Sequence, residues 1–357
     1  MTALCLTTNP GLESVVAAEW RERAQAAGCP PATPECRPLG IDGQVAIASE
    51  APTRPLAALA GQMRTIYHVM RHCHQFELPA TEPLAAIRQQ LLQLTIPEMQ
   101  AAERFRITTQ RSGDHAFSSM DVQREAGAAL VERYGKTVDL EHYDTEIRVD
   151  AFDRVCLVSV QLTRSPLDRR HPQLYAPRVA LKTVVAHAML RLSGLAAPQG
   201  RLLDPCCGSG TLLLEAAQLM PAWRCYGSDR DARCVAGARQ NLEAAGVAER
   251  CPLQQLDARD LARHFPPQGF EAIVTNPPWG IRLGRKIDLV GFYRKLLTGA
   301  WTVLVPGGRL TLLVGRKRAA FNRLLDQLGL FEVRHARAIE TNDVHPMLFV
   351  LERRDRP

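Results

Sequence analysis

The residues Val274-Thr-Asn-Pro-Pro-Trp-Gly280 follow an apolar run that begins at Phe270. This run predicts a buried strand that ends in a stiff loop, because proline fixes φ and lacks an N–H donor. Such a loop holds the Asn276 amide, the Pro277 carbonyl and the Trp279 ring together, two hydrogen-bond acceptors beside a stacking surface. That combination suits a planar ring with an exocyclic amino group. A proline-stiffened turn whose tryptophan only packs is the alternative that these residues leave open.

A glycine-containing loop lies upstream, where a short apolar strand ends at Asp204 and Pro-Cys-Cys-Gly-Ser-Gly follows. Gly208 and Gly210 allow close approach of a ligand to the backbone, and Thr211 opens a helix with an apolar face. This pattern is typical of a nucleotide-type site at the carboxyl end of a parallel strand. Leu213 stands where the dinucleotide fingerprint requires its third glycine, so a dinucleotide site is not predicted.

Two further predicted strands also end in carboxylates. The first, 225–229, ends at Asp229, 19 residues after Gly210, where an acid can accept hydrogen bonds from ribose hydroxyls. The second, 253–258, carries Asp257 near its end. The predicted strands therefore place several acids at one edge of a parallel sheet.

In this order the four motifs resemble the class I S-adenosylmethionine-dependent methyltransferases that act on exocyclic amino groups of nucleobases. The resemblance implies a Rossmann-like α/β fold with a seven-stranded sheet, and a target base held by Asn276, Pro277 and Trp279. It also implies a set of residues that contact S-adenosylmethionine around its methionine, ribose and adenine parts: Asp204, Cys206, Gly208, Gly210, Asp229, Asp257, Ala258 and Asn276. Ranges 331–340 and 344–351 predict a terminal antiparallel hairpin, since their connection is too short for a crossover helix.

The first half of the chain resembles a second family. Range 105–117, with the helix and strands predicted after it, is similar to a THUMP domain, which implies RNA binding, and the opening resembles the ferredoxin-like domain that accompanies THUMP. We therefore expect α+β domains at 1–54 (ferredoxin-like) and 55–164 (THUMP), a polar linker at 165–180, and the methyltransferase domain at 181–357. Within them we expect a strand at 65–73 and a helix at 177–192.

Charge is distributed unevenly. Residues 1–177 contain 18 Lys and Arg against 21 Asp and Glu, whereas residues 178–357 contain 26 against 16. A basic catalytic half favours a polyanionic substrate, and a solvated arginine-rich surface is the alternative. The candidate RNA contacts are basic side chains in the THUMP-like region, the linker and the loop beyond Trp279: Arg111, His115, Arg169, Arg170, Arg282, Arg285 and Lys286.

Bulk properties exclude several other classes. No apolar run reaches membrane-spanning length and the first residues lack signal-peptide features, so we expect a cytoplasmic protein. The ten cysteines form no C-x-x-C pair, and His68, His72 and His74 lack a further ligand, so no metal site is predicted.

The arrangement as a whole is similar to the tRNA guanine-N2 methyltransferases, which modify an acceptor-stem guanosine. Trp279 departs from their usual Tyr or Phe, which implies a wider pocket. Enzymes acting on guanine-N2 of large-subunit ribosomal RNA share most of these motifs and are the nearest alternative. A DNA adenine-N6 methyltransferase and a non-catalytic tRNA-binding protein are more distant alternatives. No obligate protein partner is evident.

Overall fold

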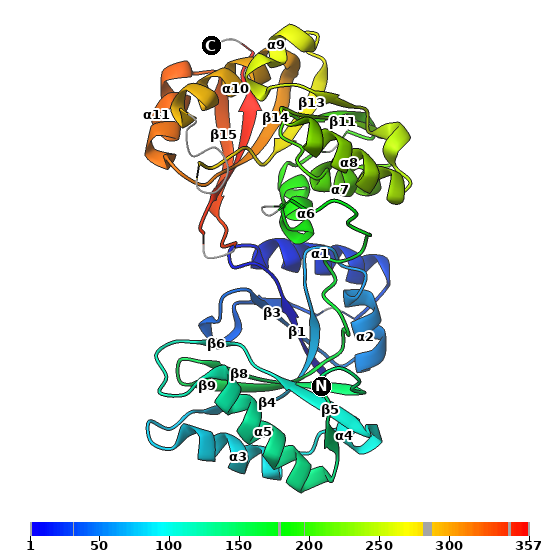
Figure 1. Cartoon of the computed structure of the whole chain (residues 1–357), viewed down its shortest axis with the longest axis vertical. Coiled ribbons are helices and arrows are strands. Elements are labelled where there is room, and N and C mark those ends of the chain that lie inside the picture. Colours follow the sequence, from blue (N-terminus) through cyan, green and yellow to red (C-terminus); the bar gives the residue numbers. More distant parts are fainter. Residues whose placement is uncertain are drawn as a thin grey trace. The chain divides into compact units, whose positions relative to one another are not determined.

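The computed structural model describes residues 2–30, 32–177, 180–195, 197–280, 288–341 and 344–355 (Figure 1). It separates into two compact units, each with its own sheet. The first unit is Met1–Thr8 with Val16–Leu167, and the second is Asn9–Val15 with Asp168–Pro357. None of the helices in the described ranges is long and apolar enough to cross a membrane.

The first unit contains a nine-stranded sheet in the order β2-β3-β1-β4-β9-β8-β5-β7, with β6 paired to β8. These strands are β1 (Thr2–Thr7), β2 (Pro34–Cys36), β3 (Gln44–Ser49), β4 (Val69–Glu77), β5 (Arg104–Thr108), β6 (Arg111–Ser112), β7 (Thr137–Val138), β8 (Thr145–Phe152) and β9 (Val155–Gln161). Because β1 pairs with β4, the sheet is continuous across the 54/55 position.

The helices of this unit are α1 (Glu13–Ala26), whose first residues up to Val15 are assigned to the second unit, and α2 (Thr53–Ala60), α3 (Pro83–Gln93), α4 (Pro97–Ala101) and α5 (Ser119–Tyr134). Helix α5 starts with a capping box, in which the Ser118 hydroxyl and the Asp121 carboxylate bond each other's backbone N–H. It ends at Gly135, whose φ of 64° suits glycine. Apolar residues of α3 and α5, with neighbouring strand residues, form one core cluster, and residues of β1, β3, α1 and α2 form another.

The strand predicted at 65–73 is shifted in the structure, since β4 begins at Val69. The reason is the buried Glu19 carboxylate, which accepts hydrogen bonds from the Thr65 N–H and hydroxyl at 3.1 and 2.6 Å. Thr65 is thereby committed to a side-chain acceptor rather than to a strand ladder.

In its described residues the second unit has a seven-stranded sheet in the order β12-β11-β10-β13-β14-β16-β15. The strands are β10 (Gly200–Asp204), β11 (Trp223–Asp229), β12 (Leu253–Gln255), β13 (Phe270–Thr275), β14 (Leu304–Val314), β15 (Phe331–Ala338) and β16 (Met347–Arg353). Strands β10 to β14 are parallel, and β16 is antiparallel to both neighbours. The predicted Rossmann-like sheet with a terminal hairpin is confirmed.

The helices of this unit are α6 (Thr183–Leu192), α7 (Thr211–Leu219), α8 (Ala232–Ala244), α9 (Leu261–His264), α10 (Leu289–Val303) and α11 (Arg318–Leu328). Successive strands run outward from β10 to β12 and then in the opposite direction from β13 to β14. Right-handed crossovers therefore place α7 and α8 on one face and α10 on the other. Strand order reverses between β10 and β13, which is where ligands bind in such sheets.

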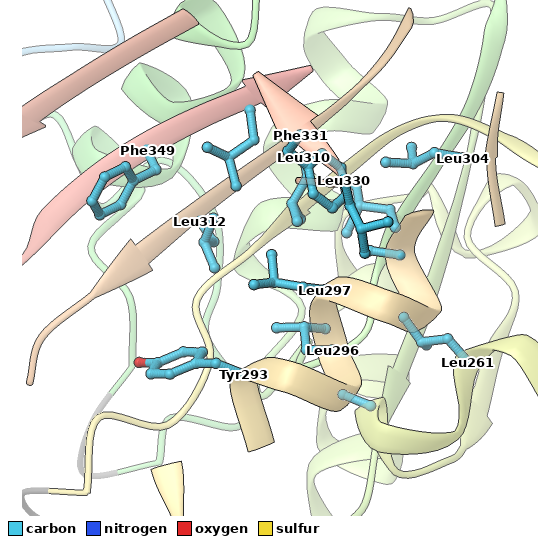
Figure 2. Close-up of a cluster of buried hydrophobic side chains, with 14 of the residues drawn as sticks. Leu261, Tyr293, Leu296, Leu297, Leu304, Leu310, Leu312, Leu330, Phe331 and Phe349 are labelled. Carbon is cyan, nitrogen blue, oxygen red and sulfur yellow. The ribbon is translucent and has the colours of Figure 1, made fainter. Parts of the chain in front are cut away.

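The core beneath α10 fixes β13 and β14. Figure 2 shows Leu296 and Leu297 of α10 directed toward Leu310 and Leu312 of β14, with Tyr293 on the same helix. Each such buried leucine contributes about 1.5–3 kcal/mol relative to an exposed one. This packing holds the carboxyl end of β13, where the loop that starts at Asn276 follows.

The helix predicted from Pro177 begins instead at Thr183, and its N-cap, Lys182, has extended backbone. The chain before α6 is held by other partners. The Thr183 hydroxyl donates to the Asp168 carbonyl at 2.8 Å, and Tyr175 exchanges backbone hydrogen bonds with the Asn241 side chain.

Candidate active site

A cavity of about 300 Å³ opens at the carboxyl ends of β10, β11 and β13. It is lined by nine of the ten residues predicted to bind cofactor or target base, and also by Lys182, Arg259 and other residues described below. The predicted residues that line it are Asp204, Cys206, Gly208, Asp229, Asp257, Ala258, Asn276, Pro277 and Trp279 together with their neighbour Pro278. Gly210 is not in the lining, because it is the N-cap of α7, with φ of 81°.

Asp204 lies beneath the glycine loop and is almost fully buried. Its Oδ1 accepts hydrogen bonds from the Thr275 hydroxyl at 2.8 Å and from the Cys206 N–H at 3.1 Å. Burial raises the pKa of Asp204 to about 7, and these two hydrogen bonds oppose the rise. A carboxyl group with such a pKa can be neutral near neutral pH and ionise beside a bound cation.

Asp229 connects two segments of the cavity wall. Its Oδ2 accepts the Gly208 N–H at 3.0 Å, and its Oδ1 accepts the Asp231 N–H at 2.9 Å. The strand end after β11 is thereby fixed against the glycine loop, with φ of Gly208 at 53°.

Asp257 lies at the third strand end, where it caps a short 3₁₀ turn rather than continuing the strand. The Arg259 guanidinium donates to both carboxylate oxygens, at 2.9 and 2.6 Å. This hydrogen bonding lowers the pKa of Asp257, so it is an ionised acceptor at the cavity wall.

The Asn-Pro-Pro-Trp loop presents polar atoms that are buried and unsatisfied. Within the described ranges neither Asn276 Oδ1 nor Trp279 Nε1 has a hydrogen-bond partner. A buried polar atom without a partner costs about 1–3 kcal/mol, which a ligand can recover. The unpaired Asn276 oxygen is therefore available to a group that enters the cavity.

Two consecutive residues after β14 support this loop. A Cβ atom added to Gly315 would lie 2.6 Å from Cγ and Cδ2 of Trp279, so the indole lies directly against the Gly315 backbone. The next residue, Arg316, donates to the Gly280 carbonyl at 3.4 Å. Gly315 was not predicted from the sequence, and no local pattern around it could have indicated this contact.

Other cavity residues were also not predicted. Pro177, Ala180, Leu181 and Lys182 precede α6, and Thr341 and Val344 belong to the connection between β15 and β16. Thr341 and Val344 exchange two backbone hydrogen bonds, at 2.8 and 3.0 Å. Short terminal connections that return to a central site give no periodic signal, although the predicted hairpin placed this connection at the same sheet edge.

The candidate RNA contacts fall into three groups. In the first unit, the Arg111 guanidinium donates to His115 Nδ1 at 3.3 Å, and His115 Nε2 donates to the Asp153 carbonyl at 2.6 Å, on an exposed surface. Arg169, which is exposed, and Arg170, which is half-buried, belong to the second unit. Arg282, Arg285 and Lys286 lie outside the described residues.

S-adenosylmethionine fits this set of groups. Its ammonium and sulfonium cations match the buried Asp204 carboxyl, and its ribose and adenine donors match Asp229 and Asp257, which line the same cavity. A doubly wound sheet with a terminal hairpin and these three acids at successive strand ends defines a class I S-adenosylmethionine-dependent methyltransferase.

Comparison with known proteins narrows this class. Residues 170–346 match the RMKL-like methyltransferase domain family, and residues 84–161 match the THUMP domain. The chain is 38% identical to the tRNA (guanine(6)-N2)-methyltransferase of Thermus thermophilus, over 97% of this chain and 98% of that protein. The tRNA (guanine(6)-N2)-methyltransferase of Archaeoglobus fulgidus is 29% identical, over 63% of this chain and 64% of that protein.

A solved structure gives the same result. The crystal structure of TrmN from Thermus thermophilus matches with a TM-score of 0.79 and 35% identity, and the match covers 99% of this chain and 100% of that one. The chain belongs to the family of THUMP-containing tRNA guanine-N2 methyltransferases.

Proposed function

We propose that this protein transfers a methyl group from S-adenosylmethionine to the exocyclic N2 of a guanosine in the acceptor stem of tRNA. The observation that carries the proposal is the unpaired, buried Asn276 Oδ1 in a cavity that Trp279 also lines. The family relatives support the choice of base and substrate, because the two tRNA enzymes named above act on guanine-N2.

The cofactor supplies an electrophilic methyl group on a sulfonium. The residues of the chain act on the acceptor, whose amino lone pair is delocalised into the ring. Asn276 Oδ1 and the Pro277 carbonyl accept the two amino hydrogens, which aims the lone pair out of the ring plane. Trp279 holds the base by stacking. Positioning and hydrogen bonding together can be worth several kcal/mol, and the released proton passes to water.

We propose further that the substrate reaches this cavity by extrusion of the target base from its helix. Unstacking costs a few kcal/mol, and stacking on the Trp279 indole with hydrogen bonds to Asn276 offsets it. The stiffness of the Asn-Pro-Pro segment reduces the ordering cost, because Pro277 and Pro278 have fixed φ.

RNA binding is assigned by the same proposal to the predicted basic residues of both units. Arg111 and His115 are presented together by the first unit, while Arg169 and Arg170 precede the catalytic sheet. Arg282, Arg285 and Lys286 follow the Asn-Pro-Pro-Trp loop in sequence. Phosphate contacts of this kind give affinity that falls with salt.

The chain also divides into domains. We propose a ferredoxin-like segment at 1–54, a THUMP domain at 55–164 and a methyltransferase domain from 181, with action in the cytoplasm. The family match from residue 170 indicates that part of the connecting segment 165–180 belongs with the catalytic domain.

Transfer of labelled methyl from S-adenosylmethionine to unmodified tRNA, followed by nucleoside analysis, tests the function. We expect N2-methylguanosine with the natural protein and at least a hundredfold lower rate with Asn276→Ala. The exposed amide variant Gln254→Ala is the matched control and should keep full activity. Label that enters only ribosomal RNA, or no RNA although the cofactor binds, would overturn the substrate assignment.

A further inference from the structure

Asn241 of α8 joins two walls of the cofactor cavity. Its side chain is 4% exposed and makes three hydrogen bonds. Its Oδ1 accepts the Tyr175 N–H at 3.0 Å, and its Nδ2 donates to the Tyr175 carbonyl at 2.8 Å and to the Ser209 carbonyl at 2.9 Å. One amide therefore holds both the segment before α6 and the glycine loop.

Helix α8 also holds the Tyr175 ring. A Cβ atom added to Gly237 would lie 2.1 Å from Cγ and 2.2 Å from Cδ1 of Tyr175, so the ring lies directly against the helix backbone. The Tyr175 hydroxyl lies 3.6 Å from the Cys234 sulfur. Positions 234, 237 and 241 share one face of α8, and all three contact Tyr175.

The segment held in this way is part of the cavity. The described residues 168–177 and 180–182, here called the strap, contribute Pro177, Ala180, Leu181 and Lys182 to the lining. Its earlier residues are tied to the same unit, since His171 Nε2 lies 3.0 Å from the Gln218 amide oxygen. The strap thus lies beside the glycine loop, and a small cavity of about 20 Å³ is lined by Asp168 and His171 of the strap and by Ser209 and Thr211.

We propose that Asn241 is a positioning residue for cofactor binding, which sets the strap and the glycine loop at the separation that the methionine part of S-adenosylmethionine requires. Asn241 itself does not line the large cavity and acts through Tyr175 and Ser209. The inference rests on the proposed function, since the ligand of the cavity is the cofactor. On this inference, part of the segment 165–180, predicted as a linker, helps to form the cofactor site.

The test is titration of the full-length protein with S-adenosylhomocysteine by calorimetry. Asn241→Ala removes the three hydrogen bonds, and we expect the Kd to rise at least tenfold with a stoichiometry near one. Gly237→Ala displaces the strap without touching the amide, so its Kd should rise similarly. In the assay with tRNA, the KM for S-adenosylmethionine should rise by the same factor while kcat stays within about twofold.

A double-mutant cycle separates positioning from general damage. Tyr175→Ala keeps the backbone bonds to Asn241 and removes the ring, so its Kd should rise by no more than about threefold. In the Tyr175→Ala background the three nearest neighbours of the added methyl group at 237, all atoms of the Tyr175 ring, are gone, and the effect of Gly237→Ala should disappear. Where Asn241→Ala fails to fold, this cycle still tests whether the position of the strap controls cofactor binding, and Asn241→Gln or Asn241→Asp, which keep a polar side chain, test the role of the amide.

Several outcomes overturn the inference. Natural-like Kd values in both Asn241→Ala and Gly237→Ala contradict it, as does a stoichiometry that falls while the Kd stays constant, since that result means unfolding. Persistence of the Gly237→Ala effect without the Tyr175 ring contradicts it as well. A natural protein that binds no S-adenosylhomocysteine overturns the proposed function itself, and this inference with it.

Discussion

Gly315→Ala should slow methyl transfer without weakening cofactor binding. The added Cβ would lie 2.6 Å from Cγ and Cδ2 of Trp279 and 2.9 Å from its Cβ, whereas ordinary contacts begin at 3.4 Å. The indole must therefore move by roughly 0.8 Å. Because a displacement of about 1 Å can cost about 10²-fold in rate, we expect kcat to fall between tenfold and a hundredfold.

The assay is single-turnover methylation of tRNA at saturating protein and cofactor, with calorimetry of S-adenosylhomocysteine in parallel. The Kd should stay within twofold, because Asp204, Asp229 and Asp257 contact other loops. Gly127→Ala is the matched control. Its new Cβ would have no neighbour closer than 3.9 Å, and it lies inside α5, where alanine is the better helix former.

Two results would refute this reasoning. A kcat within twofold of the natural protein means that Trp279 adapts or does not hold the base. A Kd for S-adenosylhomocysteine that rises as much as kcat falls means that the methyl group disturbs the cavity as a whole rather than the position of the ring.

Three further results are expected. Asp204→Asn should stabilise the catalytic unit in urea denaturation at pH 8. The pKa of Asp204 is about 7 in the folded protein and 3.8 is its ordinary value. The free energy of unfolding therefore falls by up to about 4 kcal/mol as the pH rises from below 3.8 to above 7. Equal stability of the two proteins at pH 8 would contradict this. The Kd for S-adenosylmethionine should fall from pH 6 to pH 8, by up to about tenfold per pH unit below 7, as Asp204 ionises, and calorimetry of Asp204→Asn should show a flat profile. Arg111→Ala should raise the Kd for tRNA about threefold to tenfold and lower the salt dependence of that Kd by about one charge, as measured by filter binding. The control Arg88→Ala, which removes an ion-paired side chain of α3, should change neither quantity.

The acids of the site were predictable because of a simple geometric rule. Asp204 and Asp229 each end a parallel strand, and Asn276 follows another, so their positions in sequence place them at one edge of the sheet. The terminal hairpin followed from a connection too short for a crossover. Strand ends and turn lengths are local properties, and a single sequence contains them.

The supporting residues were not predictable, because their roles depend on pairs far apart in the chain. In the sequence, nothing distinguishes Asn241 from other helical residues, because its partner Tyr175 lies 66 positions earlier. Gly315 is one of 24 glycines until Trp279 lies on it. The segment from Pro177 had a helical pattern, yet α6 begins at Thr183, whose hydroxyl bonds to the Asp168 carbonyl, and Tyr175 bonds to the Asn241 side chain. Tertiary partners overrode local preference in that case.

Several groups that lower the stability of the fold line the same cavity. Asp204 is 1% exposed and receives two hydrogen bonds, while Asn276 Oδ1 and Trp279 Nε1 receive or make none among the described residues. A buried carboxyl and two unsatisfied polar atoms in one cavity each lower stability, and apolar or neutral residues of similar size would avoid that loss. The Asp204 carboxyl and the Asn276 oxygen are explained if a bound cation and a bound amino group satisfy them, and the Trp279 N–H, which is a donor, requires an acceptor on a ligand. The same buried groups that lower the stability of the fold therefore select its ligands, a cationic cofactor beside Asp204 and a hydrogen-bond donor beside Asn276.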